Sequence, residues 1–446
     1  MALIKFYNTL SREKASFTPL DAGNIRIYAC GPTVYDRIHV GNARPVVLFD
    51  VLVRLLRHHF PKVTYVRNIT DVDDKINARA HEMGISIREL TEQTTQAFHD
   101  DCAALNTAPP DVEPRATDHI AEMITMITTL IDKGHAYEAD GHVLFHVKSM
   151  EDYGTLSRRS PEELLAGARV EVASFKKDAG DFVLWKPSEE DQPGWDSPWG
   201  VGRPGWHIEC SAMSAAYLGE VFDIHAGGLD LIFPHHENEI AQSRCAHGHD
   251  MMAQIWMHNG YVTVDGEKMS KSLGNFTTVA DVLAKFPGEA MRYALLSAHY
   301  RAPLDFSMTG VTEAKSALDS LYRAVDGADS GADPDSAVLD ALGDDLNTPN
   351  ALARLHELAR QANKGDDIAR ACLKASAELM GLLSGNASQW LKGGDENETS
   401  ILAAIEARKA AKTNKDYAEA DRIREALAAD GILLEDTPDG TIWRRK

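Results

Sequence analysis

The chain has few cysteines and no long apolar run. Its 446 residues include five cysteines, which are widely scattered and form no CxxC pair. This pattern argues against a disulfide framework and favours a reducing cytoplasm. No window approaches the roughly 18 uninterrupted apolar residues of a membrane-spanning helix. Residues 1–17 turn polar at once, so we expect no secretory signal peptide.

Positive charge is also scarce. There are 46 lysines and arginines against 67 aspartates and glutamates, a formal net charge of −21. Phosphate is repelled at long range by such a surface, which argues against indiscriminate nucleic-acid binding. RNA stays possible where basic residues gather locally. The 44% of apolar and 25% of charged residues are typical of a globular protein with a sizeable core. At this length about two to four domains are expected.

The first part of the chain predicts an α/β domain. Residues 24–29 alternate apolar and polar side chains as a strand does, and residues 43–59 have helical spacing. Residues 63–67 form a second strand, so strand, helix and strand make one βαβ unit with parallel strands. Strand signals return at residues 220–225 and 254–257.

The region between these strands is less regular and indicates an insertion. Within it, residues 187–205 are rich in proline, glycine and aspartate, which predicts an exposed loop. Gly200 to Gly205 satisfy GxGxxG literally. They follow a loop rather than a strand and contain Pro204, which excludes a dinucleotide site.

The last third of the chain predicts mainly helices. Residues 311–383 are helical and alanine-rich, and Asn347 or Thr348 can cap a helix with Pro349 in its first turn. Three further segments follow: a linker over 384–400, a charged helix over 400–429, and a strand–turn–strand ending from Gly431 to Trp443.

His39-Val40-Gly41-Asn42 lies between the first strand and its helix. Backbone N–H groups at a helix start attract phosphate, and Gly41 lets a nucleotide approach the backbone closely. His39 and Asn42 can donate hydrogen bonds to phosphoryl oxygens as charge develops there. Alone this pattern is weak, because a polar helix cap uses the same residue types.

A second motif is Lys268-Met269-Ser270-Lys271-Ser272. Two lysines in a loop that also holds serines and Gly274 can clamp a triphosphate as mobile point charges. A solvated lysine loop is the plainer interpretation of the charges. The complete five-residue string is much more specific than the charges alone.

These two motifs, in this order around a βαβ domain, resemble the HIGH and KMSKS signatures of class I aminoacyl-tRNA synthetases. Asn42 replaces the second histidine of HIGH, a variant that is usual in cysteinyl-tRNA synthetases. Other stretches are similar to hallmarks of that family: residues 28–35, 68–75, 205–211, 233–239 and 434–438. The resemblance implies ATP-dependent activation of L-cysteine to cysteinyl-adenylate and its transfer to the 3′-terminal adenosine of tRNA(Cys).

The resemblance also implies a Rossmann-like parallel-sheet catalytic domain with an insertion, then an α-helical bundle and a small C-terminal module. The expected segments are a first catalytic half (1–115), a connective insertion (116–205), a second catalytic half (206–260), a KMSKS and stem-contact segment (261–310), a tRNA-binding bundle (311–385) and an anticodon-binding module (400–446). A monomer is expected.

A metal site is a further hypothesis. His235 and Glu239 are four residues apart at the start of an expected helix, so both side chains can face one point. Cys30 and Cys210 can complete a tetrahedral site, although two buried thiols and a capped helix fit the residues as well. The resemblance places one zinc on residues matching these four. Zinc binds a cysteine thiolate far better than a serine hydroxyl, so no editing site is needed.

The resemblance assigns the remaining site residues. Catalysis falls to His39, Asn42, Lys268 and Lys271, and ATP binding to these with Gly41 and Ser270. Mg²⁺ accompanies ATP. The amino-acid pocket is formed by Cys30, Gly31, Thr70, Trp206 and Asp230.

RNA contacts are predicted near the end of the chain. The basic run consists of Arg408, Lys409, Lys412 and Lys415, and Trp443 with Arg444 suits stacking on unpaired bases. A solvated charged face is the plainer interpretation, since residues 406–446 hold nine basic and nine acidic side chains. The resemblance favours contact with the anticodon region.

Three other functions stay open from the residues. A ligase joining cysteine to an amino sugar would share the activation chemistry and the zinc, but it would not need a module after residue 390. A small-molecule adenylyltransferase would not explain the paired cysteines. A non-catalytic zinc and RNA-binding protein would not need both phosphate motifs. His235-His236-Glu237 lacks the second histidine of HExxH, which excludes a zinc protease.

Overall fold

The computed structural model describes residues 4–159, 174–190, 192–264, 266–268, 276–328, 331–392, 398–437 and 440–445. The chain divides into two compact units. The first comprises residues 1–311 and 336–352, and the second comprises residues 312–335 and 353–446. No helix in the described ranges is long and apolar enough to cross a membrane.

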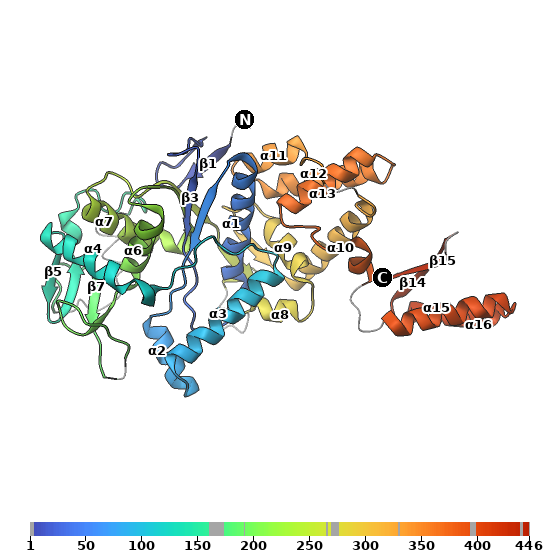
Figure 1. Cartoon of the computed structure of the whole chain (residues 1–446), viewed down its shortest axis with the longest axis horizontal. Helices are drawn as coiled ribbons and strands as arrows, with labels where there is room; N and C mark the ends of the chain where they lie inside the picture. Colours follow the sequence, from blue (N-terminus) through green and yellow to red (C-terminus); the bar gives the residue numbers. More distant parts are fainter. Residues whose placement is uncertain are drawn as a thin grey trace. The chain divides into compact units, whose positions relative to one another are not determined.

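A four-stranded parallel sheet lies at the centre of the first unit (Figure 1). Its spatial order is β10-β9-β3-β4, with bounds β3 (Ile25–Ala29), β4 (Val63–Arg67), β9 (Phe222–Gly228) and β10 (Ala253–Asn259). Ile27 of β3 pairs with Tyr65 on one side and Ile224 on the other. All three strand pairs are parallel, which confirms the sequence-based prediction. The strands are almost wholly buried, as expected when helices cover both faces.

Two helices cover the sheet on opposite sides of β3 (Figure 1). Helix α1 (Val40–His59) packs on β4 and β9, and α6 (Trp206–Leu218) packs on β3 and β4. α1 begins at Val40 rather than at the predicted residue 43, because the His39 side chain caps it. Its last turn carries Arg57, His58 and His59, which suits the negative end of a helix.

The strand order reverses between β3 and β9. From β3 the chain crosses through α1 to β4, whereas β9 and β10 lie on the other side of β3. The loops that leave the carboxyl ends of β3 and β9 therefore diverge, and a crevice opens between them in sheets of this kind. Cys30 follows β3 and Leu229 follows β9, so both loops begin at this switch point.

The insertion contains its own antiparallel sheet of order β5-β6-β7-β8. Its elements are α4 (Ile120–Asp132), β5 (Ala136–Ala139), β6 (His142–Phe145), β7 (Phe182–Pro187) and β8 (Gly202–Pro204). The predicted exposed loop over 187–205 is wrong at its end, where β8 is buried against β7. Arg203 is buried there because its Nη1 donates to the Pro187 carbonyl at 2.8 Å. A three-residue strand with glycine and proline shows no alternation that sequence could reveal.

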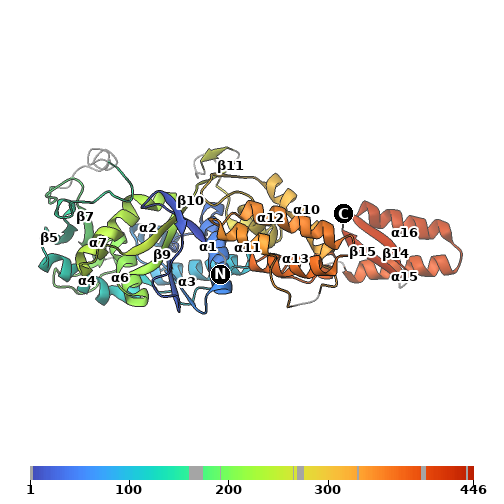
Figure 2. The ribbon, with the colours of Figure 1, turned by 90° about the horizontal axis from the view of Figure 1, so that it is seen from above.

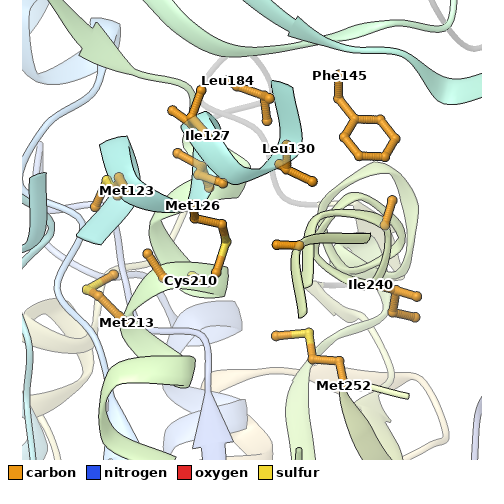
Figure 3. Close-up of a cluster of buried hydrophobic side chains, with 14 of the residues drawn as sticks. Met123, Met126, Ile127, Leu130, Phe145, Leu184, Cys210, Met213, Ile240 and Met252 are labelled. Atoms are coloured by element: carbon orange, nitrogen blue, oxygen red, sulfur yellow. The ribbon is translucent and has the colours of Figure 1, made fainter. Parts of the chain in front are cut away.

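One apolar cluster anchors the helices around the insertion (Figure 3). Met123, Met126, Ile127 and Leu130 have helical spacing and form the buried face of α4. They pack on α6, which carries Cys210 and Met213, and on α7 (Glu237–His247), which carries Ile240. The cluster therefore fixes two helices that supply polar residues to the crevice.

The remaining elements of the first unit surround the sheet. They are β1 (Lys5–Asn8), β2 (Glu13–Ser16), α2 (Asp74–Met83), α3 (Ile87–Ala104), η1 (Ala116–His119), η2 (Val147–Ser149), η3 (Leu229–Leu231), η4 (Ile232–His236), β11 (Val262–Val264), β12 (Glu267–Lys268), α8 (Val279–Leu283), α9 (Gly288–Leu296), β13 (Leu304–Phe306) and α11 (Ser336–Gly343). Helices α10 (Met308–Ala324) and α12 (Thr348–Ala362) each have residues in both units. Asn347 accepts a hydrogen bond from the Asn350 N–H at 3.2 Å, as the predicted cap requires.

The second unit ends in two helices and a hairpin (Figure 2). The predicted linker over 384–400 contains a helix, and the predicted single helix over 400–429 is two helices. The break lies at Lys415, whose φ of +58° is left-handed, and Asp416 caps the second helix. The strand–turn–strand ending is confirmed. The elements are α13 (Asp367–Leu379), α14 (Ala387–Lys392), α15 (Glu398–Thr413), α16 (Tyr417–Ala429), β14 (Ile432–Thr437) and β15 (Gly440–Arg445).

Candidate active site

Two thiols, an imidazole and a carboxylate meet at the switch point of the sheet. Cys30 follows β3, Cys210 lies in α6, His235 lies in η4 and Glu239 lies in the first turn of α7. Cys30 Sγ is 3.9 Å from Cys210 Sγ and 3.7 Å from Glu239 Oε1, and His235 Nε2 is 3.1 Å from the same Oε1. One donor atom from each residue lies within 4.8 Å of the others. The structure thus brings together the four residues of the predicted metal site.

The electrostatics of this cluster favour a bound cation. Burial, with Cys210 and Glu239 nearby, raises the pKa of the Cys30 thiol well above its usual value. The hydrogen bond with Cys30 lowers the pKa of Cys210, but burial and Glu239 outweigh it and the net direction is upward. Burial lowers the pKa of His235 well below its usual value. A divalent cation would stabilise the thiolates and so lower the pKa of both cysteines. Two thiolates, an imidazole and a carboxylate are ligands that zinc accepts.

Three histidines that the sequence-based reasoning missed surround the cluster. His225 Nε2 lies 2.8 Å from Glu239 Oε2, and His236 Nε2 lies 3.4 Å from Cys30 Sγ. His236 also pairs with His258 at 2.8 Å, and burial lowers the pKa of His258 to about 3. Cys30, His225, His236 and Glu239 form a second, overlapping donor set. The set with both cysteines suits zinc better, because thiolates are its softer ligands.

A hydrogen-bond chain lies beside the thiols. The Asn68 side chain accepts from the Gly31 N–H at 2.9 Å and donates to Thr70 Oγ1 at 3.2 Å. Thr70 donates to Glu209 Oε2 at 3.1 Å, and burial raises the pKa of Glu209 well above its usual value. A Cβ on Gly31 would lie 1.7 Å from the Asn68 carbonyl oxygen. Gly31 is therefore required for close packing, and its N–H is engaged by Asn68; its place in the amino-acid pocket stays a prediction.

Trp206 contacts the cluster through His235, and Asp230 lies in the turn after β9. Trp206 begins α6, stays 39% exposed, and stacks its ring on His235 with centroids 4.2 Å apart. Asp230 is exposed in η3, directly after β9. Thr70 lies deeper and is buried. Trp206 can therefore form one wall for a small ligand beside His235.

The histidine motif forms the start of α1. His39 Nδ1 accepts from the Gly41 N–H at 3.1 Å, and the Asn42 side chain accepts from the His39 N–H at 3.3 Å. The bond to Nδ1 places the His39 proton on Nε2, which makes that nitrogen a donor. Arg44 fixes this end of the helix, because its buried guanidinium donates to the Gly260 and Tyr261 carbonyls at 2.8 and 3.0 Å.

The lysine motif is only partly within the described residues. Lys268 ends β12, whereas Ser270 and Lys271 lie outside the described residues. The segment after the motif is hydrogen-bonded to the start of α1: Val40 N–H donates to Thr277 O, and Val279 N–H donates to Ile38 O, both at 3.1 Å. Residues 277–279, which follow the lysine motif in the sequence, thus lie beside the histidine motif.

Two of the predicted RNA contacts are buried residues. Arg408 is buried and donates to both carboxylate oxygens of Asp436 at 2.8 and 3.0 Å, and these bonds lower the pKa of Asp436 far below its usual value. Trp443 is buried in the apolar core between the hairpin and α15 and α16. Both side chains make contacts that stabilise the module, and an RNA contact by either stays a prediction. The sequence did not reveal the ion pair of Arg408, because its partner Asp436 lies 28 residues away.

The other basic residues of the run stay candidates for RNA contact. The side chain of Lys409 is 72% exposed, and Lys415 is exposed as well. Lys412 is partly engaged, since its Nζ lies 2.7 Å from Asp436 Oδ2. Arg444 lies in β15, and its prediction is untested.

Family models match most of the chain. Residues 16–316 match the tRNA synthetases class I (C) catalytic domain, residues 337–386 the DALR domain, and residues 399–444 the cysteinyl-tRNA ligase anticodon binding domain. The chain is 60% identical over 448 residues to a cysteine–tRNA ligase of Acidiphilium cryptum, with 100% of both chains covered. It is 58% identical over 456 residues to that of Rhodospirillum rubrum, with 99% of both covered.

The fold has relatives among solved structures. The Mycobacterium tuberculosis methionyl-tRNA synthetase in complex with methionyl-adenylate covers 85% of this chain and 96% of its own. The TM-score is 0.59 at 17% sequence identity, which shows a shared fold.

Proposed function

The chain belongs to the cysteinyl-tRNA synthetases, and we propose that it selects cysteine with the cluster of Cys30, Cys210, His235 and Glu239. Membership of the family establishes the reaction, the ATP-dependent attachment of cysteine to tRNA. One observation carries the proposal: two thiols, an imidazole and a carboxylate from four separate elements lie within 4.8 Å of one another.

The four residues would hold one zinc ion. When bound, zinc supplies a soft Lewis acid that binds the substrate sulfur as a thiolate and discriminates against a serine hydroxyl. His225 supports the arrangement by bonding the second oxygen of Glu239. Trp206 provides the wall next to His235, and Asp230 provides a negative charge for the substrate ammonium group.

The activation step joins cysteine to the α-phosphate of ATP. A carboxylate oxygen of cysteine attacks the α-phosphorus, and the bond from this phosphorus to the bridging oxygen breaks, which releases pyrophosphate. His39 donates from Nε2 and Asn42 from its amide, while the Gly41 backbone permits close approach of the phosphates. Lys268, Ser270 and Lys271 stabilise the charge on the phosphoryl oxygens, and Mg²⁺ accompanies ATP.

The second step transfers cysteine to RNA. A ribose hydroxyl of the 3′-terminal adenosine of tRNA(Cys) attacks the carbonyl carbon of cysteinyl-adenylate, and AMP leaves. The helical part after residue 311 and the module over 400–446 bind the tRNA. We expect the chain to act as a monomer in a reducing cytoplasm.

The alternative functions are less well supported. A ligase for an amino sugar has no use for an anticodon-binding domain, and residues 399–444 match one. A small-molecule adenylyltransferase would leave the match along the rest of the chain without a purpose.

Substitution of single cysteines tests the assignment. We expect Cys210→Ser to lose the zinc that the wild-type chain carries and to reduce cysteine-dependent ATP–pyrophosphate exchange by a factor of about 100 or more. Cys102→Ser is the matched control, because Cys102 is a buried thiol in α3 outside the cluster. Metal content is measured by atomic absorption after dialysis. Retention of zinc and exchange activity by Cys210→Ser would contradict the assignment.

A further inference from the structure

A loop of the insertion holds the start of α7. The brace loop, residues 153–157, presents three backbone N–H groups to one side chain, that of Glu237. Glu237 Oε1 accepts from Gly154 at 3.1 Å and from Leu156 at 3.3 Å, and its Oε2 accepts from Ser157 at 2.7 Å. Glu237 is buried, so its carboxylate, rather than water, accepts the hydrogen bonds of these N–H groups. Converging backbone donors of this kind form an anion-binding nest.

Two further contacts join the same segments. The Tyr153 hydroxyl donates to Asn238 Oδ1 at 2.5 Å, and burial and Glu237 raise the pKa of Tyr153, which keeps the hydroxyl a donor. The Arg159 guanidinium, just beyond the brace loop, lies 4.7 Å from the centroid of the Phe233 ring. The insertion therefore contacts three residues of this segment: Phe233, Glu237 and Asn238.

The start of α7 has little local support. Its cap residue, His236, makes no side-chain capping bond. The preceding turn is irregular, with an extended Phe233 at φ −139° and ψ 131°. His235 and Glu239 lie two residues before and two residues after Glu237. The backbone position of both residues therefore depends on contacts from outside the helix, and the brace loop supplies several of these through Glu237 and Asn238. Trp206 and His225 contact the two side chains themselves.

We propose that Glu237 is a positioning residue through which the insertion fixes the spacing of His235 and Glu239. This gives the insertion a function in cysteine selection, that of bracing the helix which carries two of the four cluster residues. The inference rests on the proposed function, because the spacing matters only if the cluster holds zinc. Mutation of a residue that holds a metal ligand in place typically lowers metal affinity or activity by about 10–100-fold.

Glu237→Gln tests the inference. Glutamine keeps the size of the side chain but replaces one acceptor oxygen with an N–H₂ group that faces backbone donors. The matched control is Asp152→Asn. Asp152 directly precedes the brace loop and forms an ion pair at 2.7 Å with Arg244 of α7, which the substitution removes. We measure KM for cysteine and for ATP in pyrophosphate exchange, and the rate of zinc transfer to a colorimetric chelator.

For Glu237→Gln we expect KM for cysteine to rise about tenfold or more, KM for ATP to stay within about twofold, and zinc transfer to be about tenfold faster. Asp152→Asn should match the wild type. Tyr153→Phe removes one hydroxyl and keeps the ring, so it should change KM and zinc transfer in the same direction by a few-fold. This second variant keeps the test decisive if Glu237→Gln does not fold.

The inference is overturned if Glu237→Gln and Tyr153→Phe match Asp152→Asn, or if KM rises equally for both substrates, which indicates a general loss of structure. Failure of the proposed function is distinguishable. In that case the wild-type chain itself binds no zinc or shows no cysteine-dependent exchange.

Discussion

Glu239 lies at the centre of the cluster although it is fully buried. One of its oxygens is 2.8 Å from His225 Nε2, and the other is 3.1 Å from His235 Nε2 and 3.7 Å from Cys30 Sγ. Burial of a carboxylate is costly unless a charge of opposite sign compensates it. The cation that we propose for this site would provide that charge.

Asp101 is a buried carboxylate of α3 whose ionisation should lower stability. Burial raises its pKa to about 6, Arg37 opposes this, and Asp100 adds to it. Because the folded-state pKa lies above the unfolded value, the stabilising contribution is complete below the unfolded pKa and is lost as pH rises through about 6. Asp101→Asn should therefore stabilise the chain at pH 8, by at most about 3 kcal/mol, and less at pH 5.

Urea unfolding at several pH values measures this effect. Asp100→Asn is the control, since Asp100 is the exposed neighbour in the same helix. A gap between Asp101→Asn and the wild type that does not change with pH would show that Asp101 ionises normally.

Single residues differed in how well the sequence revealed them. Cys30, Cys210, His235 and Glu239 were found because the chain resembles a family with a known metal pattern, not because of their spacing. His225 and His258 were missed because they lie inside strands, where alternation reads as ordinary core. The ion pair of Arg408 was not predictable from its charge run, because its partner Asp436 lies 28 residues away.

At the level of elements, regular segments were predictable and special ones were not. The strand over 63–67 has the predicted bounds, because apolar residues end abruptly at polar loops on both sides. α1 began earlier than its apolar spacing indicated, since the cap at His39 rather than the apolar pattern sets the start. β8 was missed because it is short and contains glycine and proline. The pairing partner, not the local sequence, makes it a strand.

The break between α15 and α16 predicts two opposite effects. Lys415 has a left-handed φ of +58°, so Lys415→Gly should stabilise the module by about 1 kcal/mol. Asp416 accepts a capping bond from the Glu419 N–H at 3.1 Å, so Asp416→Ala should destabilise α16 by about 1 kcal/mol. Hydrogen exchange of amides in both helices measures each change. Effects of equal sign would contradict the break as described.

At the level of the whole molecule, the parallel sheet determines where the site lies. The strand order reverses between β3 and β9, and the loops after these strands carry Cys30, the histidine motif, Asp230 and His235. The sequence predicted the βαβ unit and the parallel sheet, because hydrophobic periodicity records both. It did not predict the strand order, since that depends on which distant strands pair. The brace loop is likewise a long-range feature, formed by residues about 80 positions from Glu237.

We expect this chain to attach cysteine, and not serine, to tRNA. The most direct measurement is aminoacylation with purified protein, ATP, Mg²⁺, total tRNA and labelled cysteine or serine in parallel. We expect label on RNA with cysteine and none above background with serine, because only the thiol is a good zinc ligand. Equal labelling with both amino acids would contradict selection by the cluster. Cysteine-dependent pyrophosphate exchange without any labelled RNA would contradict the claim that tRNA is the acceptor.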